Sequence, residues 1–131
     1  MNMVVNDPQV VAEVQDAFAR YETALLANDL EGLDSCFWHD GRTIRYGIAE
    51  ILYGIGEIRA YRSGRSPAGL QRTLARTVIT SFGTDTATAS TLFERDTQPG
   101  SIGRQQQTWV RLDVGWRIVA AHVSVIPRPA A

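Results

Sequence analysis

The chain has 131 residues and a net charge of −1, with 44% hydrophobic and 21% charged residues, values typical of a globular protein. This length suits a single domain, residues 1–131, that buries a core without disulfides or metal. The balanced charge contains no basic cluster, which argues against nucleic acid as the main partner because phosphate binding requires clustered positive charge.

The absence of lysine and the small numbers of cysteine and histidine argue against several kinds of catalytic and metal site. All 13 basic residues are arginine, so no lysine is present to form a Schiff base. The single cysteine, Cys36, excludes an intramolecular disulfide, and two histidines, His39 and His122, make a histidine-rich metal site unexpected. We therefore expect neither a metal nor another cofactor.

The compartment is judged from the N-terminus and from hydropathy. Residues 1–5 lack the charged and apolar regions of a signal peptide. No apolar run is long enough to span a membrane. We expect a cytoplasmic protein that does not act at a membrane.

Three helices are predicted in the first half of the chain. Asp7-Pro8 suits a helix start, because aspartate caps and proline is tolerated in the first turn. Asn28-Asp29 ends this helix and caps a shorter one. A third helix is predicted from Glu57 to Arg65, before Ser66-Pro67. The apolar positions of the first helix are Val10, Val14, Phe18, Tyr21 and Leu25, and those of the second are Leu30, Leu33, Phe37 and Trp38.

Strands dominate the remainder. Two short strands, Thr43 to Tyr46 and Ile51 to Tyr53, lie on either side of Gly47. Turn residues separate four longer strands: Leu70 to Phe82, Thr86 to Asp96, Gly103 to Leu112 and Trp116 to Ile126. This order predicts an α+β fold in which helices cover one face of a curved antiparallel sheet. We expect a pocket between the sheet and the first helix.

Several segments resemble the nuclear transport factor 2-like (SnoaL-like) superfamily. Glu13 to Tyr21 and Asn28 to Leu33 resemble the first helix of ketosteroid isomerase and its exit, and Ala60 to Arg62 resembles the third helix of that enzyme. Gly115 to Ser124 resembles the last strand of the superfamily. The resemblance covers essentially the whole chain. It implies a cone-shaped fold, with three N-terminal helices packed on a strongly curved, mostly antiparallel sheet.

A closer resemblance is to the AtzH-like family. It rests on these blocks, in order: Phe37 to Asp40, Arg42 to Gly47, Leu52 to Gly54, Ile58 to Ala60, Gly103 to Gln105, Gln107 to Arg111 and Trp116 to Ser124. Members accompany amidases in bacterial catabolism of nitrogen-rich ureides. They include partners in oxalurate breakdown and the proposed amidohydrolase of the cyanuric acid pathway, thought to convert 1,3-dicarboxyurea to allophanate. Fold alone would not indicate this activity, because cone folds carry many functions.

Two tyrosines are implied by the isomerase resemblance. Tyr21 aligns with the tyrosine that donates to the oxyanion, and a phenol in an apolar pocket can stabilise developing charge or supply a proton. Tyr61 aligns with a second tyrosine that hydrogen-bonds the first. Ordinary helix packing is the alternative for both residues.

The first short strand departs from the isomerase. The catalytic aspartate of that enzyme falls at or beside Tyr46, where this chain has Arg45-Tyr46. Without the carboxylate, proton abstraction beside a ketone loses its base. Arginine instead suits a carboxylate substrate through a bidentate pair. If Arg45 points inward, strand alternation directs Tyr46 outward; the alternative for Arg45 is a surface or salt-bridging strand residue.

A glutamine replaces the protonated acid of the isomerase pocket at Gln105. Gln105, Gln107 and Trp109 share one face of a predicted strand. Two buried amides would suit a ureido group, which offers both N–H and C=O. The alternative is that this face is the outer one and meets a partner subunit.

Other candidate substrate contacts carry weaker signals. Trp38 corresponds to a pocket-wall aromatic, with core packing as the alternative. His122 shares a face with Ser124, but no third group is visible to orient a nucleophilic triad. Arg72 and Arg76 are expected to face the same way, either into the site as a second anion contact or toward solvent.

These observations predict a metal-independent amidohydrolase acting on a small, carboxylated ureide. Tyr21 and Arg45 are the expected catalytic residues. The expected substrate contacts are Trp38, Tyr61, Arg72, Gln105, Gln107, Trp109 and His122. The rival is a non-catalytic partner that binds the same ureide or an amidase, and a lyase or isomerase is a third possibility. We also expect a homodimer, because a large apolar sheet face is rarely left uncovered.

Overall fold

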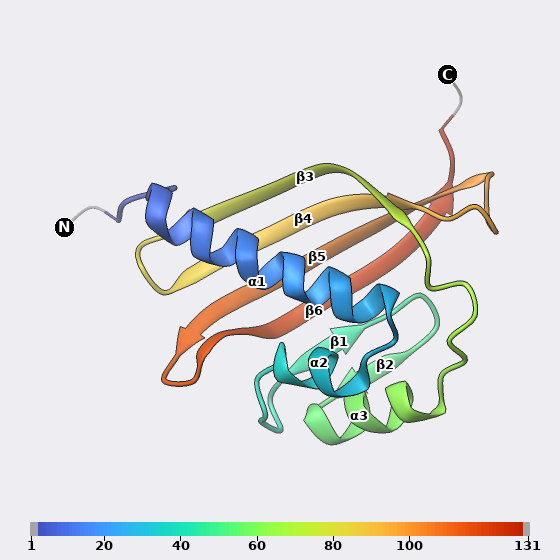
Figure 1. The fold of residues 1–131 in the computed structure, drawn as a ribbon, viewed down its shortest axis with the longest axis horizontal. Helices are drawn as coiled ribbons and strands as arrows, with labels where there is room; N and C mark the ends of the chain where they lie inside the picture. Colours follow the sequence, from blue (N-terminus) through green and yellow to red (C-terminus); the bar gives the residue numbers. More distant parts are fainter. Residues whose placement is uncertain (1–2, 130–131) are drawn as a thin grey trace.

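The computed structural model describes residues 3–129 and contains three helices and one six-stranded sheet (Figure 1). Residues 1, 2, 130 and 131 of the expected domain lie outside the described residues. The elements are α1 (Pro8–Leu26), α2 (Leu30–Ser35), β1 (Ile44–Tyr46), β2 (Ile51–Tyr53), α3 (Ile55–Gly64), β3 (Thr73–Phe82), β4 (Thr86–Glu94), β5 (Ser101–Leu112) and β6 (Gly115–Pro127).

Helix α1 forms as its sequence predicts. The Asp7 carboxylate caps it by accepting from the backbone N–H of Gln9 at 2.9 Å. Every predicted apolar position of the stripe, from Val10 to Leu25, is buried. The stripe lies against the inner face of the sheet, where it forms one core with Phe37, Trp109 and Ile118.

Helix α2 is shorter than predicted. Asp29 caps it by accepting from the Gly32 N–H at 3.0 Å, but the helix ends at Ser35. Phe37 then forms a parallel bridge with Ile118, and the Trp38 N–H donates to the Ile118 carbonyl at 3.0 Å. Pairing with β6 thus replaces the next helical turn, because the backbone groups find partners in the sheet.

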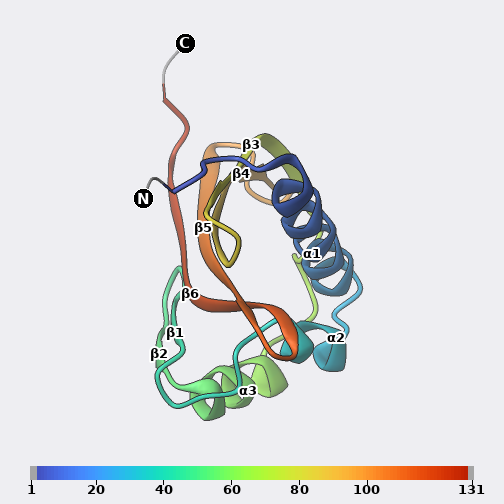
Figure 2. The ribbon, with the colours of Figure 1, turned by 90° about the vertical axis from the view of Figure 1, so that its left-hand side faces the viewer.

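The sheet has the strand order β2-β1-β6-β5-β4-β3. Strands β3 to β6 form the predicted antiparallel meander. The hairpin of β1 and β2 extends the sheet through a parallel pairing of β1 with β6, with Arg45 opposite Ala121. The sheet curves strongly, and α1 lies on its concave side (Figure 2). The predicted α+β cone fold is therefore confirmed.

One bulge corrects the expectation that Arg72 and Arg76 face the same way. The register of β3 on β4 shifts between Ala75 and Val78, and Arg76 has a φ of 52°. Arg72, just before the strand, is buried, whereas Arg76 is exposed on the outer face. A bulge inserts one extra residue into a strand and so reverses the side-chain alternation beyond it.

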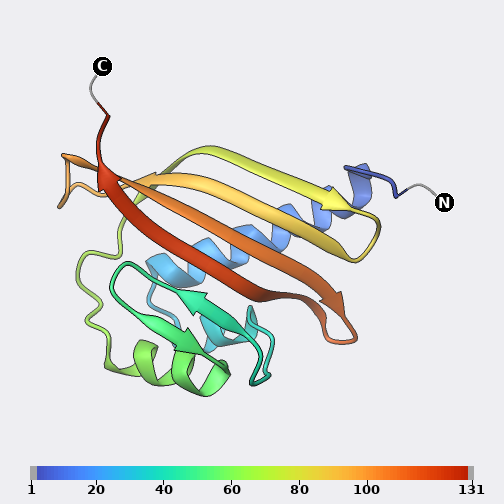
Figure 3. The same ribbon diagram turned by 180° about the vertical axis from the view of Figure 1, so that it is seen from behind.

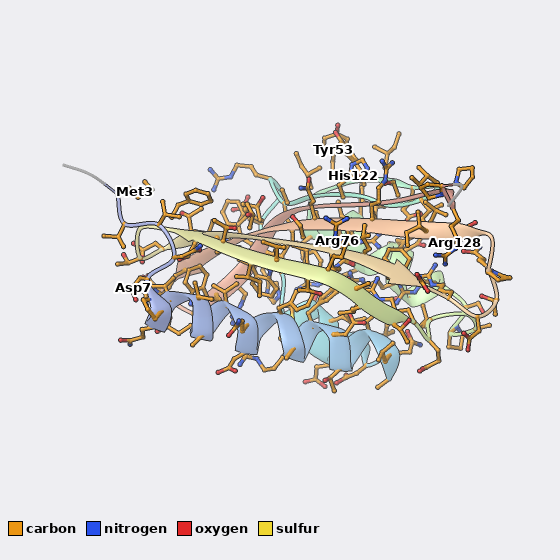
Figure 4. The ribbon with its side chains drawn as sticks, turned by 90° about the horizontal axis from the view of Figure 1, so that it is seen from above. Met3, Asp7, Tyr53, Arg76, His122 and Arg128 are labelled. Atoms are coloured by element: carbon orange, nitrogen blue, oxygen red, sulfur yellow. The ribbon has the colours of Figure 1, made fainter. Side chains whose placement is uncertain are left out.

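The outer face of the sheet carries none of the helices of residues 3–129 (Figure 3). When the molecule is seen from this side, α1 lies behind β3 to β6 (Figure 3). Tyr53 and His122 point away from α1 on this face (Figure 4). Within the described chain, no helix has both the length and the apolar character needed to cross a membrane.

Candidate functional site

Arg45 projects from β1 into the interior. Strand alternation places it inward, with 7% of its surface exposed, and Tyr46 outward, as predicted. Its Nη1 donates to Glu50 Oε1 at 2.7 Å, and the guanidinium lies 5.6 Å from the Tyr61 ring centroid. Its Nε is buried and has no hydrogen-bond partner among residues 3–129. Arg45 therefore keeps an unused donor for an anion.

Glu50 is a site residue that the sequence analysis did not identify. It lies just before β2, and its carboxylate folds back to accept from Arg45 and from the Ala49 N–H at 3.1 Å. Gly47 permits this, because a Cβ there would lie 1.6 Å from Glu50 Oε1. A glycine three residues before a glutamate in a strand-flanked turn was the signal available in the sequence.

The charge state of Glu50 follows from its neighbours. Burial raises the pKa of its carboxyl, but hydrogen bonds from Arg45 and the Ala49 N–H, with the positive charge of Arg45, outweigh burial and leave the pKa below its ordinary value. Glu50 is therefore an ionised partner of Arg45 at neutral pH.

A cavity of about 290 Å³ opens beside this pair. It lies between the β1–β2 hairpin, α3 with the loop after it, and Arg95 just after β4. No residue of α1 lines it. The pocket expected between the sheet and the first helix is a separate one of about 610 Å³, lined by Ala17, Arg20 and Thr23 of α1 and by Trp109 and Trp116 of the sheet, among others. The lining residues of the cavity beside Arg45 and Glu50 are Arg45, Ile48, Glu50, Tyr61, Arg65, Ser66, Ala68, Gly69, Leu70, Arg95 and Val123.

Tyr21 is buried on α1 and does not line this cavity. Its ring packs against Phe37, with centroids 6.3 Å apart. Arg62 of α3 also stacks on Phe37, with its guanidinium carbon 4.6 Å from the ring centroid. Arg62 is 4% exposed, and its three side-chain nitrogens are buried without hydrogen-bond partners among residues 3–129. Tyr21 and Arg62 therefore pack against the same Phe37 ring, and no hydrogen bond between Tyr21 and Arg45 is seen among residues 3–129.

The pKa of Arg62 reflects a positively charged interior. Burial lowers it most, the Tyr21 phenol opposes this, and the charges of Arg45 and Arg65 lower it further. An anion in this interior would relieve the repulsion between these guanidinium groups.

Gln105 is buried on the inner face of the sheet, and not on the outer face that could meet a partner subunit. Its Oε1 accepts from Arg72 Nη2 at 3.1 Å, and Arg72 is itself held by Glu22 through two hydrogen bonds of 2.6 and 3.0 Å. Because a guanidinium can only donate, the amide oxygen must face Arg72. The buried Nε2 of Gln105 is left without a partner among residues 3–129.

Gln107 and Trp109 also lie on the inner face. Trp109 Nε1 donates to Gln107 Oε1 at 3.0 Å, and both side chains are buried. Indole nitrogen only donates, so this contact fixes the amide of Gln107 with its oxygen toward the tryptophan. Internal donors therefore occupy both amide oxygens, which leaves N–H groups rather than the mixed N–H and C=O edge expected from the sequence. Neither glutamine lines the cavity beside Arg45.

Two predicted substrate contacts lie outside this interior. His122 is exposed on the outer face, where its ring centroid is 6.2 Å from that of Tyr46, because alternation along β6 turns it away from α1. Trp38 is half-buried near the surface, with the Arg42 guanidinium 4.8 Å from its ring centroid. Neither is buried, unlike Tyr21, Gln105 and Gln107, and we exclude both from the candidate site.

The interior carries more positive than negative charge. Five buried or half-buried arginines meet two carboxylates, Glu22 and Glu50, which are already paired with Arg72 and Arg45. The donors that remain suit a ligand rich in acceptor oxygens. The arginines are Arg45, Arg62, Arg65, Arg72 and Arg95. Within residues 3–129, no three His, Cys, Asp or Glu side chains are grouped to hold a metal ion.

Comparison with known proteins relates the whole described chain to one family. The AtzH-like family model matches residues 3–129. A Pectobacterium atrosepticum protein of unknown function, whose crystal structure is known, has 55% sequence identity to this chain. The two structures superpose with a TM-score of 0.93, covering 95% of this chain and 99% of that one. A cystatin-like fold protein from Burkholderia xenovorans is 52% identical, with a TM-score of 0.94, covering 98% of this chain and 100% of that one.

More distant structures share the fold alone. A nuclear transport factor 2-like protein with a cystatin-like fold from Novosphingobium aromaticivorans is 20% identical, with a TM-score of 0.71, covering 93% of this chain and 85% of that one. No functionally curated protein matches the chain.

Proposed function

The chain belongs to the AtzH-like family, and from this premise we propose that it is a cytoplasmic amidohydrolase that removes a carboxyl group from a small ureide such as 1,3-dicarboxyurea. The observation that carries the proposal is the buried Arg45, whose free Nε lies beside a cavity of a size suited to a small molecule. A carboxylated ureide supplies both the carboxylate for this arginine and acceptor oxygens for the interior N–H donors.

The reaction needs one proton at nitrogen. The bond between the ureide nitrogen and the carboxyl carbon breaks, its electron pair stays on nitrogen, and nitrogen takes up a proton as carbon dioxide leaves. Overall, the 1,3-dicarboxyurea dianion and water give allophanate and hydrogencarbonate. A positioned donor near the nitrogen accelerates such a step.

The proposed roles follow from the donors available. Arg45 binds a substrate carboxylate, while Glu50 holds the guanidinium in place. The Tyr21 hydroxyl donates to the developing charge or to the leaving nitrogen, beside Arg62. The N–H groups of Gln105 and Gln107 orient the ureido oxygens, since internal donors already occupy their own oxygens.

The rival proposal is a protein that binds the ureide, or an amidase of the same pathway, without catalysis. The position of Tyr21 favours this non-catalytic proposal, because neither Tyr21 nor any other residue of α1 lines the cavity where Arg45 would bind the ligand. An isomerase or lyase receives less support. Glu50 is the carboxylate in the cavity, and its low pKa beside Arg45 makes it a weak base.

Turnover by the purified protein tests the proposal. An upstream amidase would supply 1,3-dicarboxyurea, and allophanate would be followed for the wild type, Arg45→Ala and Tyr21→Phe. We expect both variants to lose about 100-fold or more in rate, because each removes a group that stabilises or protonates the reacting atoms.

The control is Tyr53→Phe, which removes an exposed phenol hydroxyl on the outer face and should leave turnover unchanged. Thermal unfolding of each variant checks that the fold is retained. No acceleration over the spontaneous reaction would refute the enzymatic proposal and favour the binding partner. Undiminished turnover in Tyr21→Phe would remove that residue from the mechanism.

A further inference from the structure

Two arginines of the cavity are not used by the proposed chemistry. The lining contains three guanidinium groups, Arg45, Arg65 and Arg95, and one carboxylate, Glu50. That carboxylate is already paired with Arg45 at 2.7 Å. The positive charge of Arg65 and Arg95 is therefore left without a carboxylate in the cavity wall.

The hydrogen bonding of these two arginines is also incomplete. The Nε of each is buried and has no partner among residues 3–129. Arg65 makes one long contact, from Nη2 to Asn28 Oδ1 at 3.5 Å, with a neutral amide. Arg95 stacks on Phe93, with its guanidinium 4.9 Å from the ring centroid. Stacking positions a guanidinium and leaves the N–H groups at its edge free to donate.

The electrostatic surroundings agree with this geometry. Burial lowers the pKa of Arg95, and the positive charges of Arg72 and Arg65 lower it further. Like charges held together at a cavity wall are stabilised by a bound anion, which also satisfies their free donors.

We infer that Arg65 and Arg95 form a second carboxylate subsite facing Arg45, so that the cavity selects small dicarboxylates over monocarboxylates. This inference rests on the proposed function, in which Arg45 holds the first carboxylate. It names the specificity-determining residues for a dianionic substrate. Loss of one carboxyl group turns the dianion into a monoanion, which gives up one of the two subsites and is released more easily.

Binding of unreactive acids to the intact protein tests the subsite without relying on turnover. Calorimetric titration at low ionic strength would compare malonate with propionate and succinate with butyrate. We expect the wild type to bind the dicarboxylate at least about tenfold more tightly than the monocarboxylate of equal chain length, the effect of one additional charge-assisted pair.

Arg95→Gln and Arg65→Gln should each remove most of this preference while changing monocarboxylate affinity less than about twofold. Arg45→Ala should weaken both kinds of ligand. Arg20→Gln is the matched control, because it removes the same charge from an exposed position of α1 outside the cavity. Thermal unfolding establishes that each variant is folded.

The inference is overturned if the wild type shows no preference for dicarboxylates, or if Arg95→Gln and Arg65→Gln both keep it. The outcome is separable from that of the proposed function. Preferential binding of dicarboxylates without turnover would support the subsite and refute the enzyme. Turnover dependent on Arg45, with a preference insensitive to Arg65 and Arg95, would refute the subsite alone.

Discussion

The ion pair of Arg45 and Glu50 connects the folding of the β1–β2 hairpin to the candidate site. Both side chains are largely buried, at 8% and 15% exposure, and they meet at 2.7 Å. Removing one partner from such a pair costs more than the pair contributes, because the other charge is left buried. The pair therefore fixes the direction of the Arg45 guanidinium toward the cavity.

This pair predicts a dependence of stability on pH. The pKa of Glu50 is lower in the folded protein than its ordinary value, so its stabilising contribution is complete above the unfolded pKa, about 4.3. The contribution is lost as the pH falls through the folded value. We expect Glu50→Gln to lower the free energy of unfolding at pH 7 by about 1–3 kcal/mol, because the buried Arg45 loses its charged acceptor. The difference in free energy of unfolding between the wild type and Glu50→Gln should become smaller below about pH 4, where Glu50 is protonated in the unfolded chain.

Urea unfolding of the wild type and Glu50→Gln across pH 3–7 would measure this effect. Arg45→Met is the matched variant, since it removes the cation that lowers the pKa of Glu50 and should flatten the acid side of the curve in the same way. Parallel curves for wild type and Glu50→Gln would show that Glu50 does not titrate differently in the folded protein.

At the level of elements, one glycine on β5 positions an aromatic ring of the site. Gly103 pairs with Phe93 of β4, and a Cβ at Gly103 would lie 2.2 Å from the Phe93 ring. The ring is 2% exposed and lies beneath the guanidinium groups of Arg72, at 4.7 Å, and Arg95, at 4.9 Å. Phe93 therefore has little space in which to move.

Gly103→Ala should lower the free energy of unfolding by about 1–3 kcal/mol, the usual cost of overpacking a core. Chemical denaturation measures it. Gly100→Ala is the control, because a Cβ there meets no atom within 4 Å. Equal stability of the two variants would contradict a rigid packing of Phe93 on Gly103.

At the level of the whole molecule, the outer face of the sheet is the surface expected to join two copies. Val78 is 58% exposed there, and Ile51 and Tyr53 of β2 are also exposed. A groove on this face is lined by residues of four neighbouring strands, including Arg76, Ser90, Arg104 and His122. We propose a twofold homodimer through this face, in which the partner covers the exposed apolar side chains of Val78, Ile51 and Tyr53.

Light scattering should then give twice the chain mass at micromolar concentration, and Val78→Glu should shift the protein to a monomer. Val114→Glu is the control, because Val114 is similarly exposed in the turn between β5 and β6, away from this face. A wild-type monomer, or a dimer unaffected by Val78→Glu, would contradict the proposed interface. A functional association with an amidase remains a separate proposal.

The sequence by itself determined the order of the elements, the fold class and the family. Local signals were sufficient for these, since the caps Asp7 and Asp29 and the apolar period of α1 act within a few residues of one another. Alternation on β1 likewise predicted that Arg45 and Tyr46 face opposite sides of the sheet, and the structure places Arg45 inward. The parallel pairing of β1 with β6 had no comparable local signal.

Only the tertiary structure decided which side chains meet. Gln105 is oriented by Arg72, 33 residues away, and Arg72 is held by Glu22, 50 residues away. The bulge after Ala75 turns Arg76 outward, and Glu50 enters the cavity because Gly47 leaves space for it. Such contacts depend on strand register and on how α1 packs against the sheet, and hydrophobic periodicity carries no information about either.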